Sequence, residues 1–365
     1  MEHVAFATTP TYLIYEKRMK NEECILLPSG WYSPLLGEDG RGISIYHSSI
    51  PSFIQRIAAT PAMQRLDGVG MNCGCEYTNF PRFRNIRRYT RYEHSIGVGL
   101  IVWHFTHDIQ QSIGALLHDI ATPTFAHVID FLHGDYEKQE STEEHTLEMI
   151  SHSSEIVEIL HEYSLQPIDV ADYHLYPIAD NDTPQISADR LEYTLGNIIT
   201  YHLDTLETVQ QIYQSLIVGK NEHGVPELMF STLANASRFA HLSLKCSKIY
   251  VDDEDRYAMQ RLAELLANAI QLGVISEEDL YTTEKHVIAR LLSNFQTASE
   301  WQHYCQLSKI LIGPHHPNAQ QINAKKRHIN PYVYQQGRTT DLDPSYCAAL
   351  QAFLSQSFDT WVSGI

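Results

Sequence analysis

The residues with the clearest chemical potential in this chain are a histidine and an aspartate that stand side by side, His118 and Asp119. They end the apolar run Ala115-Leu116-Leu117, where an unpaired carboxylate would be costly to bury and a bound cation would remove that cost. Adjacent residues on a helix point about 100° apart, because a turn contains 3.6 residues. The two side chains can therefore reach one ion only if it lies beyond the helix end, with other helices closing the site.

Two further residues are candidates to complete such a site: His94 on the preceding predicted helix and Asp189 on a later one. Two imidazoles and two carboxylates form a mixed nitrogen and oxygen set, which suits one divalent Mn, Fe, Zn, Ni or Mg ion and does not distinguish among them. Because the chain has 20 histidines, chance His-Asp neighbours are also expected. We interpret His107-Asp108 as such a pair, solvated on a polar helix face.

Composition indicates an ordinary globular protein of one large domain or two, with 365 residues of which 43% are hydrophobic and 19% charged. The chain lacks the run of ~18 apolar residues that a membrane helix needs, and its N-terminus has no signal-peptide pattern. These features predict a cytoplasmic protein with no membrane partner. The six cysteines do not form the paired spacing of a zinc module, so we interpret them as reduced thiols.

The net charge of −18 predicts a surface that repels polyanions, yet one segment before His94 is strongly basic. This segment contains Arg82, Arg84, Arg87, Arg88 and Arg91. Arginine offers bidentate donors to phosphate oxygens. Arg91 precedes His94 by three residues and so shares its helical face, which favours a phosphate-binding role. We interpret most of the other arginines as a solvated basic loop.

The elements that position these residues are mainly helices. The first fifty residues alternate in places and carry Gly and Pro, which indicates a short β-containing lead-in. A helix is predicted to begin at Thr60-Pro61, with a capping hydroxyl and a proline in the first position. Further helices are predicted over 92–109, 112–120, 188–201, 206–218, 257–272, 286–294 and 345–362.

A capping box at Ser141-Thr142-Glu143-Glu144 places His145 in the first turn of the next predicted helix. Two polar regions connect other helices. Residues 160–185 indicate a polar connecting segment, and around 313–337 the composition changes to Pro, His, Gln and Asn, with the cluster Lys325-Lys326-Arg327.

The ligand candidates extend from residue 94 to 189, so the catalytic core cannot be divided within that range. We predict a mostly α fold with small N-terminal and C-terminal β elements: a lead-in over 1–50, a helical core over 51–220 and a mainly helical region over 221–365.

Several motifs of this chain follow one another in an order typical of one enzyme family. They are Thr60-Pro61 through Gln64-Arg65-Leu66, Arg91-x-x-His94-Ser95-x-Gly97-Val98, Leu117-His118-Asp119, Phe125-Ala126-His127, His145 and Ala188-Asp189-Arg190-Leu191-Glu192-Tyr193. At these residues the chain resembles the HD-domain metal-dependent phosphohydrolases, and among them the deoxynucleoside triphosphate triphosphohydrolases. The similarity covers residues 50–220 and continues weakly through 276–280 and Lys326-Arg327.

The resemblance implies an HD-domain helical core, a homo-oligomer and one divalent metal ion. The implied metal ligands are His94, His118, Asp119 and Asp189. Catalytic roles are implied for His145 and Asp119, and contacts to the substrate phosphates for Arg91, His127, Arg190 and Tyr193. Histidine can protonate a leaving oxygen near neutral pH, and arginine stabilises charge on phosphates. The predicted partner is a phosphate-bearing small molecule, first of all a nucleotide such as a dNTP.

The chain departs from the family pattern at two places. The family's Gly-His-x-x-Phe-Ser-His stretch reads Ala121 to His127 here, with Thr122 in place of a histidine that assists the chemistry. The Gln-Leu-Gly that contacts the nucleoside in the family is Met71-Asn72-Cys73 here. Threonine is neither an acid nor a base near neutral pH, so we expect weak or selective dNTP turnover.

Two other functions remain open at this point. Some HD-domain proteins bind two irons and oxidise small molecules, which would need two more histidines, here His145 with His161 or His174. Alternatively, the protein is a metal-stabilised, non-enzymatic binder of a nucleotide or nucleic acid, with the basic segment as its contact surface. The charge of −18 weighs against extensive nucleic-acid contact.

Overall fold

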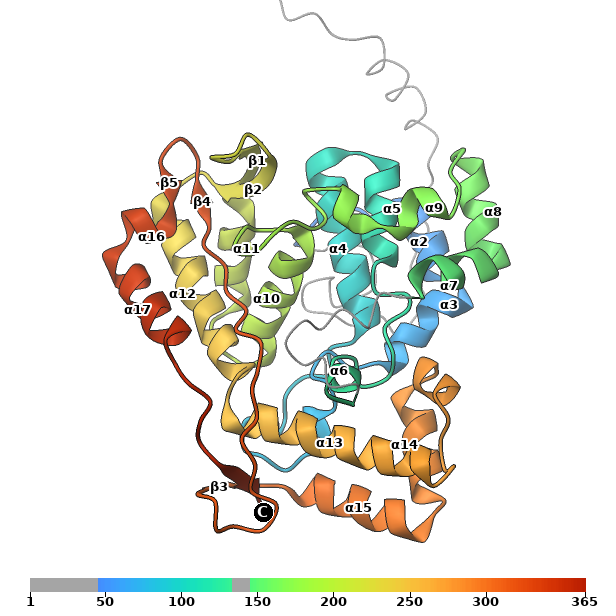
Figure 1. Cartoon of the computed structure of the whole chain (residues 1–365). Helices are drawn as coiled ribbons and strands as arrows, with labels where there is room; N and C mark the ends of the chain where they lie inside the picture. Colours follow the sequence, from blue (N-terminus) through green and yellow to red (C-terminus); the bar gives the residue numbers. More distant parts are fainter. Residues whose placement is uncertain (1–44, 133–144) are drawn as a thin grey trace, which may run out of the picture.

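Helices dominate the fold of the computed structural model, which describes residues 45–132 and 145–365 (Figure 1). This confirms the predicted mostly α class. Six short strands accompany the helices in the described ranges, and all of them lie after residue 215. Within those ranges, no helix is long and apolar enough to cross a membrane.

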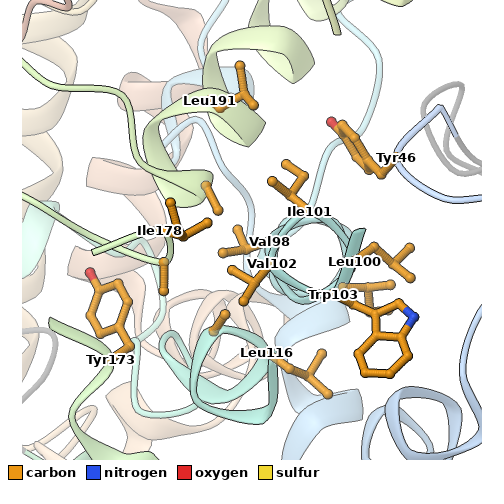
Figure 2. Packing of buried hydrophobic residues seen from close by; sticks show 14 of the residues in the cluster. Tyr46, Val98, Leu100, Ile101, Val102, Trp103, Leu116, Tyr173, Ile178 and Leu191 are labelled. Carbon is orange, nitrogen blue, oxygen red and sulfur yellow. The ribbon is translucent and has the colours of Figure 1, made fainter. Parts of the chain in front are cut away.

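Three helices form the centre of the first half: α4 (Arg91–Thr106), α5 (Ile109–Leu117) and α10 (Ala188–Thr200). Thr90 caps the start of α4: its side chain accepts from the Glu93 amide while the Glu93 carboxylate accepts from the Thr90 amide. In Figure 2, side chains such as Val98, Ile101 and Trp103 point outward on several sides of α4. This helix is therefore buried almost all round, as expected for an apolar helix without a polar face.

Shorter helices surround these three. Those that cover the first core are α2 (Ser52–Ala58), α3 (Pro61–Gln64), η2 (Arg65–Gly68), α7 (Thr146–His152), α8 (Ser154–Glu162), α9 (Ile168–Ala171), η4 (Tyr173–Leu175) and α11 (Leu206–Gln214). Two others, η3 (Cys75–Tyr77) and α6 (Val128–Leu132), contribute their apolar side chains to the other core of the protein.

The second half builds another core around α13 (Asp253–Gln271), which packs between α6 and α15 (Phe295–Gln306) in the lower part of Figure 1. The other helices are α12 (Leu233–Ile249), η5 (Glu278–Tyr281), α14 (Glu284–Leu292), α16 (Thr339–Leu342) and α17 (Pro344–Leu354). One sheet has the order β1 (Leu216–Lys220), β2 (Pro226–Phe230), β4 (Tyr332–Val333) and β5 (Gly337–Arg338). A second pairs β3 (Ile310–Ile312) with β6 (Val362–Gly364) in antiparallel register. The chain between β3 and β4 carries the basic cluster predicted at 325–327.

Several local predictions need correction. His107 and Asp108 do not lie on a helix face: His107 adopts a left-handed φ of 50° that ends α4, and the Asp108 carboxylate caps α5 by accepting from the Gln111 amide. Pro61 does occupy the first position of α3, but the Thr60 hydroxyl donates to the Ile57 carbonyl instead of capping.

The ends of other predicted elements also differ. His145 is the residue before α7 rather than part of its first turn, and the proposed capping box at 141–144 lies outside the described residues. The helix predicted over 206–218 ends at Gln214, and the strand β1 follows it. The terminal helix predicted over 345–362 ends at Leu354, and Val362, the last residue of the predicted helix, lies in strand β6. The β-containing lead-in falls mostly outside the described residues, and 45–50 form no strand.

Candidate metal centre

The four predicted ligand side chains converge where α4, α5 and α10 meet. His94 lies in the first turn of α4, His118 follows the last residue of α5, and Asp189 lies in the first turn of α10. The two Nε2 atoms of the histidines are 3.2 Å apart. Asp189 Oδ1 is 3.0 Å from His94 Nε2 and 3.8 Å from His118 Nε2, and Asp119 Oδ2 is 3.7 Å and 3.6 Å from the same two nitrogens. Helices far apart in sequence thus gather His94, His118 and Asp189 around one point, and Asp119 Oδ2 lies within 3.7 Å of both imidazoles.

The hydrogen bonds on the far side of each ring fix which nitrogen faces that point. His118 Nδ1 lies 2.7 Å from the Ala115 carbonyl oxygen, which can only accept, so Nδ1 carries the hydrogen. His94 Nδ1 lies 2.6 Å from the Glu192 carboxylate, which also accepts. In their neutral forms both rings therefore direct an Nε2 lone pair at the same place. Two facing lone pairs repel each other, and a shared cation relieves that repulsion.

The titration of these groups agrees with a site built for positive charge. Burial disfavours protonation of His94, but hydrogen bonds to Asp189 and Glu192 outweigh it and raise its pKa to about 10. Burial likewise opposes ionisation of Asp189, yet the His94 contact holds its pKa well below the usual range. Positive charge is therefore favoured between His94 and Asp189, and a divalent ion could supply it. The donor set and its charge fit such an ion.

Asp119 is held from two directions. Arg91 Nη1 is 2.9 Å from Asp119 Oδ2, and the Thr122 hydroxyl donates to Oδ1 over 2.7 Å. Burial would raise the pKa of Asp119, but Arg91 and the two imidazoles hold it well below its ordinary value. Arg91 is itself buried, and its Nε has no hydrogen-bond partner in the described part of the chain.

A cavity of about 580 Å³ opens beside these side chains. His118, Asp119 and Asp189 line it, and so do all four residues predicted to face the substrate, Arg91, His127, Arg190 and Tyr193. Its wall is completed from the C-terminal half of the chain by the run Lys325-Lys326-Arg327-His328. Each half of the chain therefore contributes to the same cavity.

Two of the four predicted substrate residues, Arg190 and Tyr193, differ in whether their polar groups already have partners within the described part of the protein. Arg190 is engaged within the protein, because it pairs with Asp180 at 3.1 Å and its other nitrogens donate to oxygens of Asn181 and Gln185. Burial raises the pKa of Tyr193 to about 12, so its hydroxyl stays protonated.

The imidazole of His127 is oriented by contacts at both of its ring nitrogens. Its Nδ1 lies 2.9 Å from a carboxylate oxygen of Asp130, which is fully buried, and its Nε2 lies 3.4 Å from Arg327 Nη2. Burial lowers the pKa of His127 despite the Asp130 contact. The basic cluster Lys325-Lys326-Arg327, to which the sequence assigns no role, thus supplies a cation next to the predicted phosphate site.

In the basic segment before His94, only Arg91 lines the cavity. The others contact groups elsewhere in the protein: Arg82 pairs with Asp252, Arg84 with Asn79, Arg87 with Glu93 and Arg88 with Asp67.

His145 does not join this site. It lines a second cavity of about 730 Å³ together with Arg65 and Tyr281, and its Nδ1 lies 3.3 Å from a carboxylate oxygen of Glu148. Its side chain is 45% exposed. Its catalytic role stays a prediction that this geometry does not support.

The histidines that a two-iron site would need are not gathered either. His161 is exposed on α8. His174 lines the metal cavity, but its ring nitrogens lie near Asp172 and Asp180, at 3.3 Å and 3.5 Å. In residues 45–132 and 145–365, the metal-binding side chains that cluster closely are His94, His118 and Asp189.

Glu192 is the residue of this centre that the sequence reasoning missed. A carboxylate three residues after Asp189 on one helix does not by itself indicate a contact with His94 across the helix interface. A signal did exist, because a metal-binding histidine commonly donates its second ring N–H to a carboxylate.

Comparison with known proteins agrees with this architecture. Residues 91–209 match the family model described as the HD domain. The chain is 29% identical over 245 residues to the uncharacterized protein YdhJ of Bacillus subtilis, which covers 66% of this chain and 70% of that protein. It is also 29% identical over 154 residues to the metal-dependent phosphohydrolase cns2 of Cordyceps militaris, covering 42% of this chain and 43% of that protein.

Proposed function

We propose that this protein is a metal-dependent phosphohydrolase that acts on a nucleotide or a related phosphate ester, with dNTPs as the first substrates to test. The observation that carries the proposal is the convergence of two histidine Nε2 atoms and two carboxylates beside the buried Arg91, at the wall of one cavity. The HD-domain match and the similarity to cns2 support it.

His94, His118, Asp119 and Asp189 would hold the metal ion. A divalent ion bound there supplies Lewis acidity, since it withdraws charge from phosphoryl oxygens and lowers the pKa of water. The protein contributes the rest: Arg91 and Arg327 both line the cavity, and Arg327 Nη2 lies 3.4 Å from His127 Nε2. Two guanidinium groups around one imidazole favour a phosphate-bearing substrate over an uncharged one.

His127 can move a proton at this position. Asp130 accepts from Nδ1 and so orients the ring with Nε2 toward Arg327 and the cavity. Because burial lowers its pKa, the neutral imidazole predominates near pH 7 and can accept a proton from an attacking water. The same group can return that proton to a leaving oxygen.

The organic part of the substrate would occupy the part of the cavity lined by Asn72, Asn197, Tyr201 and Tyr250. The Tyr201 hydroxyl donates to Asn72 and the Asn197 amide donates to Tyr250, which fixes these polar groups. Asn197 Oδ1 is buried and accepts no hydrogen bond from any described residue. A nucleoside carries hydroxyl and amino donors that would satisfy it, because an unsatisfied buried acceptor costs about 1–3 kcal/mol.

The test is metal analysis of the purified protein, followed by a Mn²⁺-supplemented panel of dNTPs, nucleoside monophosphates and p-nitrophenyl phosphate. Phosphorus NMR of the products separates release of triphosphate from release of orthophosphate. The variant to compare with the wild type is Asp189→Asn, because Asp189 is the more exposed of the two carboxylate ligands. This variant should lose both metal and turnover.

Three results would contradict the proposal. A metal-loaded protein that neither hydrolyses nor binds any phosphate ester would overturn it. Nucleotide binding without turnover would indicate the non-enzymatic binder, and two irons per chain with oxidation of an uncharged molecule would indicate the oxygenase. The homo-oligomeric state implied by the resemblance remains a prediction.

A further inference from the structure

We infer that Glu192 is a positioning residue for the metal site: it fixes His94 as a ligand, and two tyrosines and two glycines are arranged to hold it there. The inference rests on the metal site of the proposed function and not on the identity of the substrate. It concerns the contact between α4 and α10, on the side of His94 away from the cavity.

The Glu192 carboxylate is surrounded by donors. It is 1% exposed, and its Oε2 lies 2.6 Å from His94 Nδ1. The Tyr89 hydroxyl donates to the same Oε2, and the Tyr46 hydroxyl donates to Oε1 over 3.1 Å. Both tyrosines are buried, and burial, followed by the charge of Glu192, raises the pKa of each hydroxyl well above its ordinary value. The hydroxyls therefore remain donors across the physiological range.

Such a carboxylate is expensive to bury, because its ion-pair partner among the described residues is a histidine and not a lysine or arginine. A glutamine or an apolar residue would fill the same space at lower cost. The arrangement is understandable if the charge acts on His94, since a carboxylate that accepts from Nδ1–H fixes the ring orientation and makes Nε2 a stronger ligand.

The two helices leave room for this assembly at their glycines. A Cβ on Gly97, one turn after His94 in α4, would lie 2.6 Å from Glu192 Cγ and Oε1. A Cβ on Gly196, one turn after Glu192 in α10, would lie 2.5 Å from the Tyr89 hydroxyl oxygen. Neither glycine has a positive φ, so neither is needed for backbone conformation. Glycine within a helix is destabilising, and these two positions make sense as space for Glu192 and Tyr89.

The assembly also makes the two histidine ligands unequal. His118 donates its Nδ1–H to the neutral Ala115 carbonyl, whereas His94 donates to a carboxylate. His94 should therefore be the more basic nitrogen ligand and contribute more to metal affinity. Loss of the Glu192 charge should weaken metal binding even when His94, His118, Asp119 and Asp189 are all present.

The experiment measures Co²⁺ affinity and the Co²⁺ absorption spectrum of the full-length protein with Glu192→Gln. Glutamine keeps the size and one acceptor but removes the charge. We expect affinity to fall by about 10–100-fold, the usual effect of losing such a partner, with a shifted visible band. Glu284→Gln is the matched control, because Glu284 is also buried and accepts from a tyrosine, Tyr77, and from the Gly70 amide, but contacts no ligand. It should leave affinity and spectrum unchanged.

Two further variants keep the inference testable if Glu192→Gln does not fold. Tyr89→Phe retains the carboxylate and removes one donor, and Gly97→Ala pushes against Glu192 from α4; each should weaken Co²⁺ binding several-fold. Wild-type affinity and spectrum in Glu192→Gln, or in both of these variants, would overturn the inference. Metal binding without any hydrolysis would overturn the phosphohydrolase alone, whereas a wild-type protein that binds no divalent ion would overturn both.

Discussion

The ion pair between Arg91 and Asp119 gives a quantitative test of how the centre is built. Asp119→Asn keeps the size of the side chain and an oxygen that can accept from Thr122, but it removes the negative charge 2.9 Å from Arg91 Nη1. The two side chains are 9% and 10% exposed, so water from the cavity can replace the lost partner only in part. With metal chelated, we expect this variant to leave a buried, uncompensated guanidinium.

The expected loss follows from that burial. Removing one partner of a buried ion pair costs about 3–5 kcal/mol of unfolding free energy. Arg91 adds to this cost because its Nε already lacks a hydrogen-bond partner in the described residues. If the charge is the cause, Arg91→Met combined with Asp119→Asn should recover most of the loss, since no unpaired charge remains.

The assay is equilibrium urea unfolding in EDTA, with Asp67→Asn as the matched control. Asp67 pairs with Arg88 at 3.3 Å, but these side chains are 54% and 68% exposed, so its loss should cost about 0–1 kcal/mol. The reasoning is refuted if Asp119→Asn costs no more than Asp67→Asn. It is refuted equally if the double variant is no more stable than the single one.

Three further outcomes are expected. In the protein with its metal chelated, the pKa of His94 is raised to about 10, against about 6.5 in an unfolded chain. This shift contributes stability that is complete below pH 6.5 and is lost as the pH rises toward 10. The unfolding free energy of His94→Gln should therefore vary less between pH 6.5 and 10 than that of the wild type. His127→Gln should retain its metal, measured by mass spectrometry, and lose about 10²–10⁴ in turnover of the best substrate; unchanged turnover would exclude His127 as the proton carrier. Arg91→Ala should raise KM for a phosphate substrate, and Arg91→Lys should recover only part of the affinity, because a point charge cannot reproduce a bidentate fork; full recovery would argue against that geometry.

Residues close in sequence were the most predictable part of this fold. The start of α10 at Ser187-Ala188 and the apolar run that ends at His118 are local patterns, and both helices form near the predicted positions. The break between α4 and α5 was placed slightly wrong, because the apolar pattern continues through a left-handed His107 that no propensity requires. The strand β1 was assigned to a helix, since its Leu-Ile-Val run directly follows a helical pattern and pairs only with the later strand β2.

Site residues could be predicted where the residue type itself indicates metal binding. They could not be predicted where the role of a residue depends on a contact with a distant part of the chain. The four ligand candidates were selected as His and Asp beside apolar runs, and the structure places them together. The helical face that Arg91 shares with His94 predicts that this arginine of the basic segment faces the cavity, and Arg91 does line it. Glu192 and Arg327 could not be assigned, because each reaches its histidine partner from a different part of the chain, 98 and 200 residues away.

Thr122 shows why a departure from a family pattern has to be read in three dimensions. In sequence it is only the absence of a histidine, and it suggests weakened chemistry. In the structure its hydroxyl donates to Asp119 Oδ1, and its carbonyl and that of Ile120 accept from Arg65 Nη2, each at 2.8 Å, so the turn after Asp119 is fixed at several points. Thr122 therefore positions Asp119, one of the proposed ligands, and in the proposed function proton transfer would come from another group at the cavity. His127, oriented by the buried Asp130, is the imidazole in a position to supply it.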